Sequence, residues 1–102
     1  MITSFFPGRI RLRAPIFKEQ DLVSKAKSIL SKCDAVETIE HNPLTGSVLI
    51  TYIPEKLPME ELIAMQDFFK TLAKEAENFD GTNKQKISDM LDELSSITDN
   101  FA

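Results

Sequence analysis

Three arginines stand at alternate positions, Arg9, Arg11 and Arg13, with Ile10 and Leu12 between them. A guanidinium group carries a permanent charge and binds carboxylates and phosphates through paired hydrogen bonds. Alternate residues of a β-strand point to the same face of the sheet. The spacing therefore predicts a row of cationic groups that could bind an acidic partner protein, a phosphate-rich ligand, or the acidic helices of a second copy of the chain.

Other interpretations of the same row remain open. The arginines could have a structural role and pair across the sheet with Glu37 or Glu40. A phosphate or nucleotide site is less favoured, because a phosphate cradle needs several free backbone N–H groups and Pro15 removes one of them. Nucleic acid is a poor fit, since the net charge is −4 and no aromatic residues alternate with the arginines to stack on bases.

Thiolate and imidazole groups that could bind a metal ion are scarce, because the chain has one cysteine, Cys33, and one histidine, His41. About eight residues of extended chain, roughly 25 Å, could separate the two. One ion cannot bridge them within a chain, which leaves an intermolecular site from two chains as the alternative. The chain also shows no nucleophile–base pair, carboxylate pair or phosphate loop. We therefore predict no catalytic residues, no cofactor and no enzyme activity.

Composition limits the class of protein. The chain has 102 residues, 42% hydrophobic and 27% charged, which is typical of one soluble domain with a modest core. No apolar run reaches the roughly 18 residues of a membrane span, and no secretion signal is apparent, which predicts a cytoplasmic protein. Charge is uneven: residues 1–33 carry a net +5 and residues 34–102 a net −9.

The arginines need a strand to align them, and the pattern predicts one over Arg9–Arg13 that ends at Pro15. Apolar residues at helical spacing predict a helix over residues 19–32. Two β-rich runs, residues 35–41 and 47–53, flank the turn formers of "HNPLTG" and predict a hairpin. Val36 and Ile39 are three residues apart, which indicates a bulge between them.

Two further helices are predicted, over residues 59–77 and from Thr82 or Asn83 to Thr98. The order βαββα plus one helix predicts an α+β, ferredoxin-like domain. We expect a three-stranded antiparallel sheet with helices on one face and a C-terminal helix in place of the fourth strand. Residues 1–80 would form the domain, and residues 81–102 a helical extension packing on it or on a partner subunit.

The Arg9–Arg13 strand would then lie at an edge of the sheet. An open edge invites pairing with another chain. We therefore predict self-association, as a dimer, through this edge or through the C-terminal helices. The alternative is a monomer whose last helix folds back on the domain.

The segments "PGRIRLRAP" and "CDAVETIEHNPLTGSVLITYIPE" together resemble the heavy-metal-associated domain superfamily. The likeness covers roughly residues 7–66 and is closest to the divergent branch without cysteines, which also occurs near the start of some metal-transporting P-type ATPases. Typical members bind a soft metal ion through Cys-x-x-Cys on the loop after the first strand. The matching loop here, residues 14–18, has neither sulfur nor imidazole, so carrying copper or zinc by that route is not expected.

The resemblance implies a small binding or adaptor module that acts through protein–protein contacts. Its partners would be a metal-transporting P-type ATPase, a metal-storage protein or a second copy of itself. The alternative is a metal-binding or metal-delivery protein with a non-standard site at Cys33 or His41.

Overall fold

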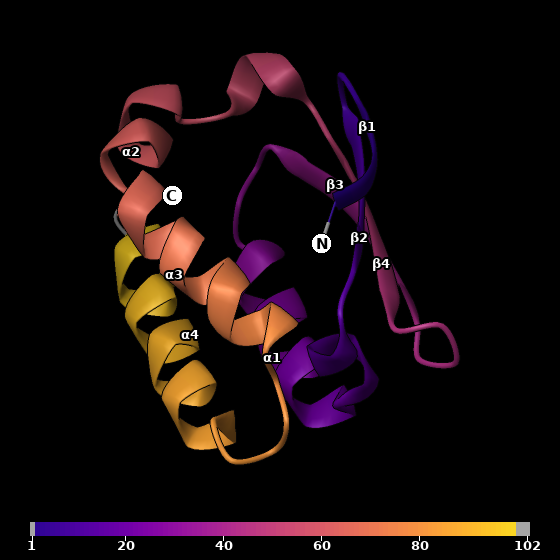
Figure 1. Cartoon of the computed structure of the whole chain (residues 1–102). Coiled ribbons are helices and arrows are strands. Elements are labelled where there is room, and N and C mark those ends of the chain that lie inside the picture. Colours follow the sequence, from indigo (N-terminus) through magenta and orange to yellow (C-terminus); the bar gives the residue numbers. More distant parts are fainter. Residues whose placement is uncertain (1, 100–102) are drawn as a thin grey trace.

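An antiparallel sheet carries all the helices on one of its faces (Figure 1). The computed structural model describes residues 2–99. The strands are β1 (Ile2–Phe6), β2 (Arg9–Arg13), β3 (Val36–Asn42) and β4 (Ser47–Tyr52). The helices are α1 (Gln20–Leu30), α2 (Met59–Ala64), α3 (Gln66–Glu77) and α4 (Lys84–Thr98). Two 3₁₀ turns, η1 (Pro15–Lys18) and η2 (Pro54–Lys56), follow β2 and β4.

The sheet has four strands in the order β1-β2-β4-β3, and every neighbouring pair is antiparallel. Because β4 lies between β2 and β3, the β2–α1–β3 unit has the split arrangement of ferredoxin-like domains. The predicted α+β class is therefore confirmed. The predicted three-stranded sheet is wrong, because β1 adds a fourth strand.

The additional strand forms at the N-terminal end of the chain, before the turn at Pro7–Gly8. Gly8 has φ of +86°, a conformation that glycine adopts without steric cost, and it allows Phe6 to pair with Arg9. β1 is also rich in the β-branched and aromatic residues that favour strands. It occupies the side of β2 that the prediction left open. The Arg9–Arg13 strand is therefore not an edge, and the place of the fourth strand is filled by β1 rather than left to the C-terminal helix.

The second hairpin agrees closely with the sequence pattern. β3 pairs with β4 around the turn at residues 43–46, and the register shifts between Val36 and Thr38. This irregularity confirms the predicted bulge. Gly46 closes the turn at φ of +67°, and its N–H donates to the carbonyl of Asn42 at 3.0 Å.

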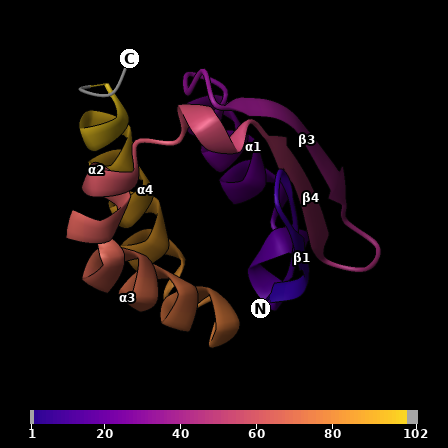
Figure 2. The same cartoon turned by 90° about the horizontal axis from the view of Figure 1, so that it is seen from above.

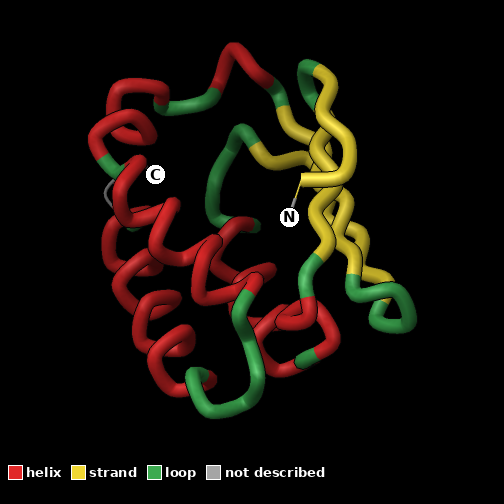
Figure 3. The backbone as a smooth tube through the Cα atoms, in the orientation of Figure 1, coloured by secondary structure: helices red, strands yellow, loops and turns green. Residues whose placement is uncertain are grey.

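The helices form two further layers over the inner face of the sheet (Figures 2 and 3). η1 and α1 pack on the sheet, and α3 and α4 pack on η1 and α1. The main hydrophobic core lies between these two helical layers. Its buried members are Ala14, Ile16, Leu22, Ile29, Ala76, Ile87, Leu91 and Leu94.

The long helix predicted over residues 59–77 is interrupted. Met65 has φ of −100° and ψ of 9°, outside the helical range, and separates α2 from α3. Nothing in the sequence marks the break, because Met65 is a good helix former and neither Gly nor Pro is close to it. The interruption lets α3 follow α4 and η1.

The apolar stripe of α4 is buried within its own chain. Ile87 is 1% exposed, and Leu91 and Leu94 are nearly as buried, against α1 and α3. This stripe is therefore not available for the predicted pairing of C-terminal helices between subunits. The predicted boundary at residue 80 stays a prediction.

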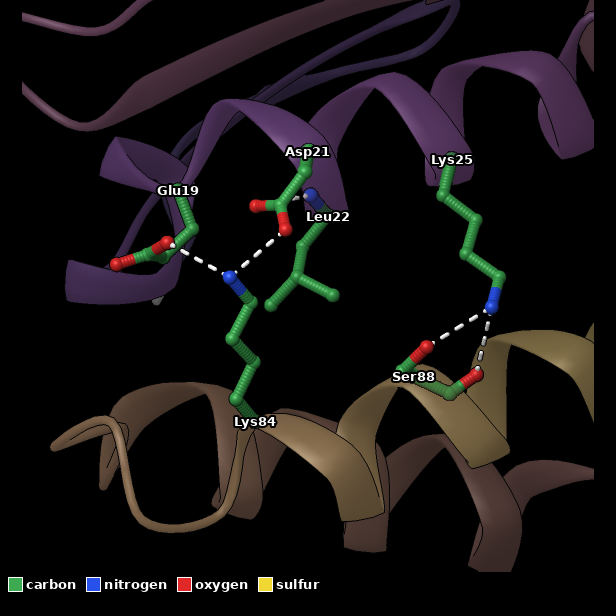
Figure 4. Close-up of polar contacts among 6 residues, drawn as sticks. All are labelled: Glu19, Asp21, Leu22, Lys25, Lys84 and Ser88. Atoms are coloured by element: carbon green, nitrogen blue, oxygen red, sulfur yellow. Dashed lines mark hydrogen bonds and ion pairs between the residues drawn. The ribbon is translucent and has the colours of Figure 1, made fainter.

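Ion pairs flank the contact between α1 and α4 (Figure 4). Lys25 Nζ lies 2.7 Å from Asp92 and donates to Ser88 Oγ at 2.9 Å. Lys84 Nζ lies 2.7 Å from Asp21, and this hydrogen bond lowers the pKa of Asp21 below its ordinary value. The same contact raises the pKa of Lys84. These pairs bridge α1 and α4 on the surface beside their apolar contact.

A second polar link joins α3 to the start of α4. Asn83 precedes α4, but its side chain does not cap the helix; its Nδ2 donates to the carboxylate of Glu75 at 3.0 Å. Lys86 Nζ contacts the same carboxylate at 2.8 Å. Both hydrogen bonds lower the pKa of Glu75, with that from Asn83 the larger cause.

Among residues 2–99, no helix is long and apolar enough to cross a bilayer.

Candidate interaction surface

None of the described helices covers the outer face of the sheet (Figure 2), and the three arginines form a row on this face. Arg9, Arg11 and Arg13 are all exposed, while Ile10 and Leu12 between them are half-buried on the inner face. β2 is held from both sides, by β1 and by β4. The row predicted from sequence is therefore present, and it lies on an interior strand whose backbone is fixed.

Of the two segments that carry the family resemblance, the first forms β2 and the second forms β3 and β4, and β4 pairs with β2. Hydrogen bonds close this pair at both ends: the N–H of Tyr52 donates to the carbonyl of Gly8 at 2.9 Å, and the N–H of Ala14 donates to the carbonyl of Gly46 at 3.1 Å. A Cβ at Gly46 would lie only 3.1 Å from the carbonyl oxygen of Ala14, so a larger residue would crowd this strand end. The glycines of both segments therefore serve to bring these strands together and to support the arginine row.

A hollow of about 740 Å³ opens on the outer face beside the row. Its lining includes Arg11, Arg13, Glu40, Asn42, Ser47 and Leu49. Leu44, at the tip of the β3–β4 hairpin, also contributes and is 89% exposed. The hollow thus combines guanidinium groups, hydroxyl and amide groups, and leucine side chains.

The predicted cross-strand pairing with acidic residues has only partial support. Glu40 lies in the same hollow as Arg11 and Arg13, but Leu49 of β4 stands between Arg11 and Glu40 in the strand register. Within residues 2–99, Arg9 and Arg13 form no ion pair. Two of the three guanidinium groups are therefore available to an external carboxylate.

The loop after β2 is the place where typical metal-binding relatives carry their cysteines. Here it contributes buried apolar side chains to the core. It folds as η1, and Ala14 and Ile16 are buried, Ile16 at 5% exposure in the main core. His41 Nε2 donates to the backbone carbonyl of Phe17 in the same loop. This loop offers no thiolate or free imidazole for a transition metal, so its residues do not fit a soft metal ion.

The structure keeps Cys33 and His41 apart, at opposite ends of β3. Cys33 follows α1 and borders a separate hollow with Asp34, Lys56 and Pro58. Val48, which pairs with His41, is buried, and His41 Nε2 contacts Phe17 of η1, so the imidazole faces the helices, while His41 also borders the hollow on the outer face. No group of three or more His, Cys, Asp or Glu side chains suited to a metal ion is present in the described part of the chain.

The comparison with protein families decides the classification. The model of heavy metal associated domain 2 matches residues 1–101. The chain belongs to this family. The match is longer than the likeness expected over residues 7–66, and it includes β1 and α4. No curated protein and no solved structure matches the chain.

Sequence reasoning missed one part of this surface, the contribution of β1. Phe6 pairs with Arg9 and shares its face, and it is 62% exposed. Ser4 stands opposite Arg11. The dipeptide Pro7–Gly8 before the arginine strand is the turn signal that could have revealed β1.

Proposed function

We propose that this protein is a non-catalytic binding module whose outer sheet face docks an acidic segment of a partner protein. One observation carries the proposal: Arg9, Arg11 and Arg13 are exposed in a row on an uncovered sheet face, in a chain whose net charge is −4. A cationic face on an acidic protein directs anionic partners to that face.

The composition of the face supports protein rather than small-ion binding. Arginine and aromatic residues are enriched among the side chains that contribute most to protein interfaces. Here Phe6, Leu44 and Leu49 lie near the arginines, and Phe6 and Leu44 are among the most exposed apolar residues of the chain. A partner that pairs carboxylates with the arginines could cover these apolar groups at the same time.

The fixed backbone of β2 also favours binding of a partner. Because β1 and β4 hold its backbone, the arginine Cα positions need no ordering on binding, and only side-chain entropy is lost. A planar guanidinium also pairs with a carboxylate through two parallel hydrogen bonds, which fixes the orientation of a partner strand or helix.

We further propose that the connection of this chain with metals lies in its partner, a metal-transporting P-type ATPase or a metal-storage protein. The packing of Ile16 into the core and the engagement of His41 by Phe17 support this division of roles. In calorimetric titrations with zinc, copper(I) and iron(II), we expect no submicromolar binding. Submicromolar binding that disappears in Cys33→Ser or His41→Ala would contradict the proposal and establish a metal-binding protein.

The docking proposal is tested with a short fluorescein-labelled peptide of alternating glutamate and leucine, followed by fluorescence anisotropy. The double variant Arg9→Glu/Arg13→Glu should weaken binding about tenfold or more, since it removes two exposed ion pairs, each contributing up to about 1 kcal/mol, and places like charges against the peptide carboxylates. The matched control is Lys27→Glu/Lys70→Glu, which makes the same charge change at exposed lysines of α1 and α3. Equal loss in both double variants would show that net charge, rather than the arginine row, governs binding.

A further inference from the structure

We propose that β1 joins two copies of this chain edge to edge, in an antiparallel pairing about a two-fold axis that extends each sheet into its neighbour. The inference goes beyond the proposed function and does not depend on it. It concerns a different element, the outermost strand, and a different kind of contact, backbone hydrogen bonding between strands.

The two edges of the sheet differ in how they are protected against such pairing. Both edge strands contain a register irregularity, after Val36 in β3 and after Ile2 in β1, so the difference between them lies in charge. β3 carries Glu37 and Glu40, and charged side chains are a usual means by which natural edge strands avoid pairing with other chains. β1 has the sequence ITSFF, without a charged side chain or a proline. Of the two edges, β1 is the one left open.

The side chains of β1 are exposed to an unusual degree for apolar residues. Ile2, Phe5 and Phe6 are 59%, 61% and 62% exposed. The register shift between Ile2 and Ser4 places Ile2 opposite Leu12 and Phe5 opposite Ile10, so that both apolar side chains lie on the inner face. β1 makes its main contacts with β2. The main contacts of α3 and α4 are with η1, with α1 and with each other, not with β1. An apolar strip therefore remains at this edge.

A second copy of the chain fits this edge because β1 is complementary to itself. An antiparallel two-fold contact uses the same patch on both subunits, and an uncharged strand meets its own copy without like-charge repulsion. Ile2 and Phe5 of each copy would then lie against those of the other.

The arginine rows do not oppose this arrangement. Neighbouring strands are about 4.8 Å apart, so three strand spacings place the two β2 rows roughly 14 Å from each other. This separation exceeds the Debye length of about 8 Å at physiological ionic strength. The dimer would present both arginine rows on one continuous sheet face.

The test is the mass of the full-length chain by sedimentation velocity over a range of concentrations, at low and high salt. We expect a reversible dimer that persists at high salt and is lost in Phe5→Lys, because a lysine protects an edge strand. The matched control is Leu44→Lys, the same charge change at an apolar hairpin residue that is 89% exposed; it should leave the dimer intact. A monomer at all concentrations, or a dimer unaffected by Phe5→Lys, would overturn the inference.

A second measurement keeps the inference testable if Phe5→Lys fails to fold. In a Cys33→Ser background, Ser4→Cys should form a disulfide-linked dimer on mild oxidation, because the two-fold axis brings the central residues of both strands close together. Glu37→Cys on β3 is the control and should remain uncrosslinked. Equal crosslinking of both variants would contradict edge pairing through β1.

An association that weakens with salt and is lost in Arg9→Glu/Arg13→Glu but not in Phe5→Lys would instead indicate docking of the arginine row on the acidic helices of the second copy.

Discussion

At the scale of single residues, Ile16 shows how the loop after β2 differs from a loop that holds a metal ion through Cys-x-x-Cys. It lies in the loop where related domains place their cysteines, yet it is buried in the core with Leu22 and Ile29. Its role is to fill space between the two helical layers. The loop is therefore a packing element, and its backbone carbonyl at Phe17 is bound by His41.

Substitution of Ile16 by alanine should reveal this packing role. We expect Ile16→Ala to lower the free energy of unfolding by about 2–5 kcal/mol, because it removes buried methylene and methyl groups and leaves a cavity. The measurement is urea denaturation of both proteins. Leu44→Ala, at a residue that is 89% exposed, is the control and should change stability by less than about 0.5 kcal/mol. A similarly small effect at Ile16 would show that the loop does not support the core.

The exposure of the arginines could be predicted from sequence, whereas the partner of His41 could not. Alternation of Arg9, Ile10, Arg11, Leu12 and Arg13 has the period of a strand, and a strand with one buried face fixes which side chains are exposed. The hydrogen bond of His41 joins residues 24 positions apart in sequence. It depends on how η1 packs against β3 and β4, which local patterns do not determine.

At the scale of elements, the sequence predicted β2, α1 and the β3–β4 hairpin because each has a clear period and clear turn residues. It did not predict β1, since Ile2–Phe6 lacks the regular alternation of a half-buried strand that β2, of equal length, shows. Nor did it predict the break at Met65, which has no local cause. Both features follow from tertiary packing: β1 from pairing with β2, and the break from the course of α3 along α4 and η1.

The contact between α1 and α4 should depend on pH through Asp21. The hydrogen bond from Lys84 holds the pKa of Asp21 below its ordinary value of 3.8. A carboxylate whose pKa is lowered by folding stabilises the folded state above its ordinary pKa. This contribution is lost as the pH falls through the lower folded value. The pKa of Lys84 is raised, so the opposite loss occurs at alkaline pH, above its ordinary value of 10.5.

Urea denaturation of the protein and of Asp21→Asn between pH 2 and pH 7 checks this linkage. The variant should be slightly less stable at neutral pH, and the difference should disappear at the acid end of the range. Glu93→Gln is the control, because Glu93 is exposed on α4 and forms no ion pair within the described residues. A constant difference between the protein and Asp21→Asn over the whole range would rule out titration of Asp21 as its source.

At the scale of the whole molecule, charge is divided between the two sides of the fold. β1, β2 and β4 contain three arginines and no acidic side chain, while the edge strand β3 carries Glu37 and Glu40. The helices α2, α3 and α4 together contain eight acidic and four basic residues. The basic sheet face points away from this acidic helical layer (Figure 2). The molecule therefore presents one face suited to anionic partners.

The sequence shows that basic residues gather in the first third of the chain and acidic residues in the rest. It does not show on which faces of the fold these residues lie. Separation of the arginines from the acidic helices depends on all helices packing on one side of the sheet. The ferredoxin-like pattern of elements predicted that arrangement. The sequence pattern placed the arginine row on an edge strand. Because β1 forms a fourth strand beside β2, the row instead lies on an interior strand that is paired on both sides.

The docking surface that we propose is the arginine row on the outer face of the sheet. Its most direct test is a titration of isotope-labelled protein with the glutamate–leucine peptide, followed by amide chemical shifts. We expect the largest changes in β2 and β4, at the amides of residues 9–13 and 47–51, and we expect them to disappear in Arg9→Glu/Arg13→Glu. Changes concentrated in the helices or around Cys33, with β2 and β4 unaffected, would contradict this proposal.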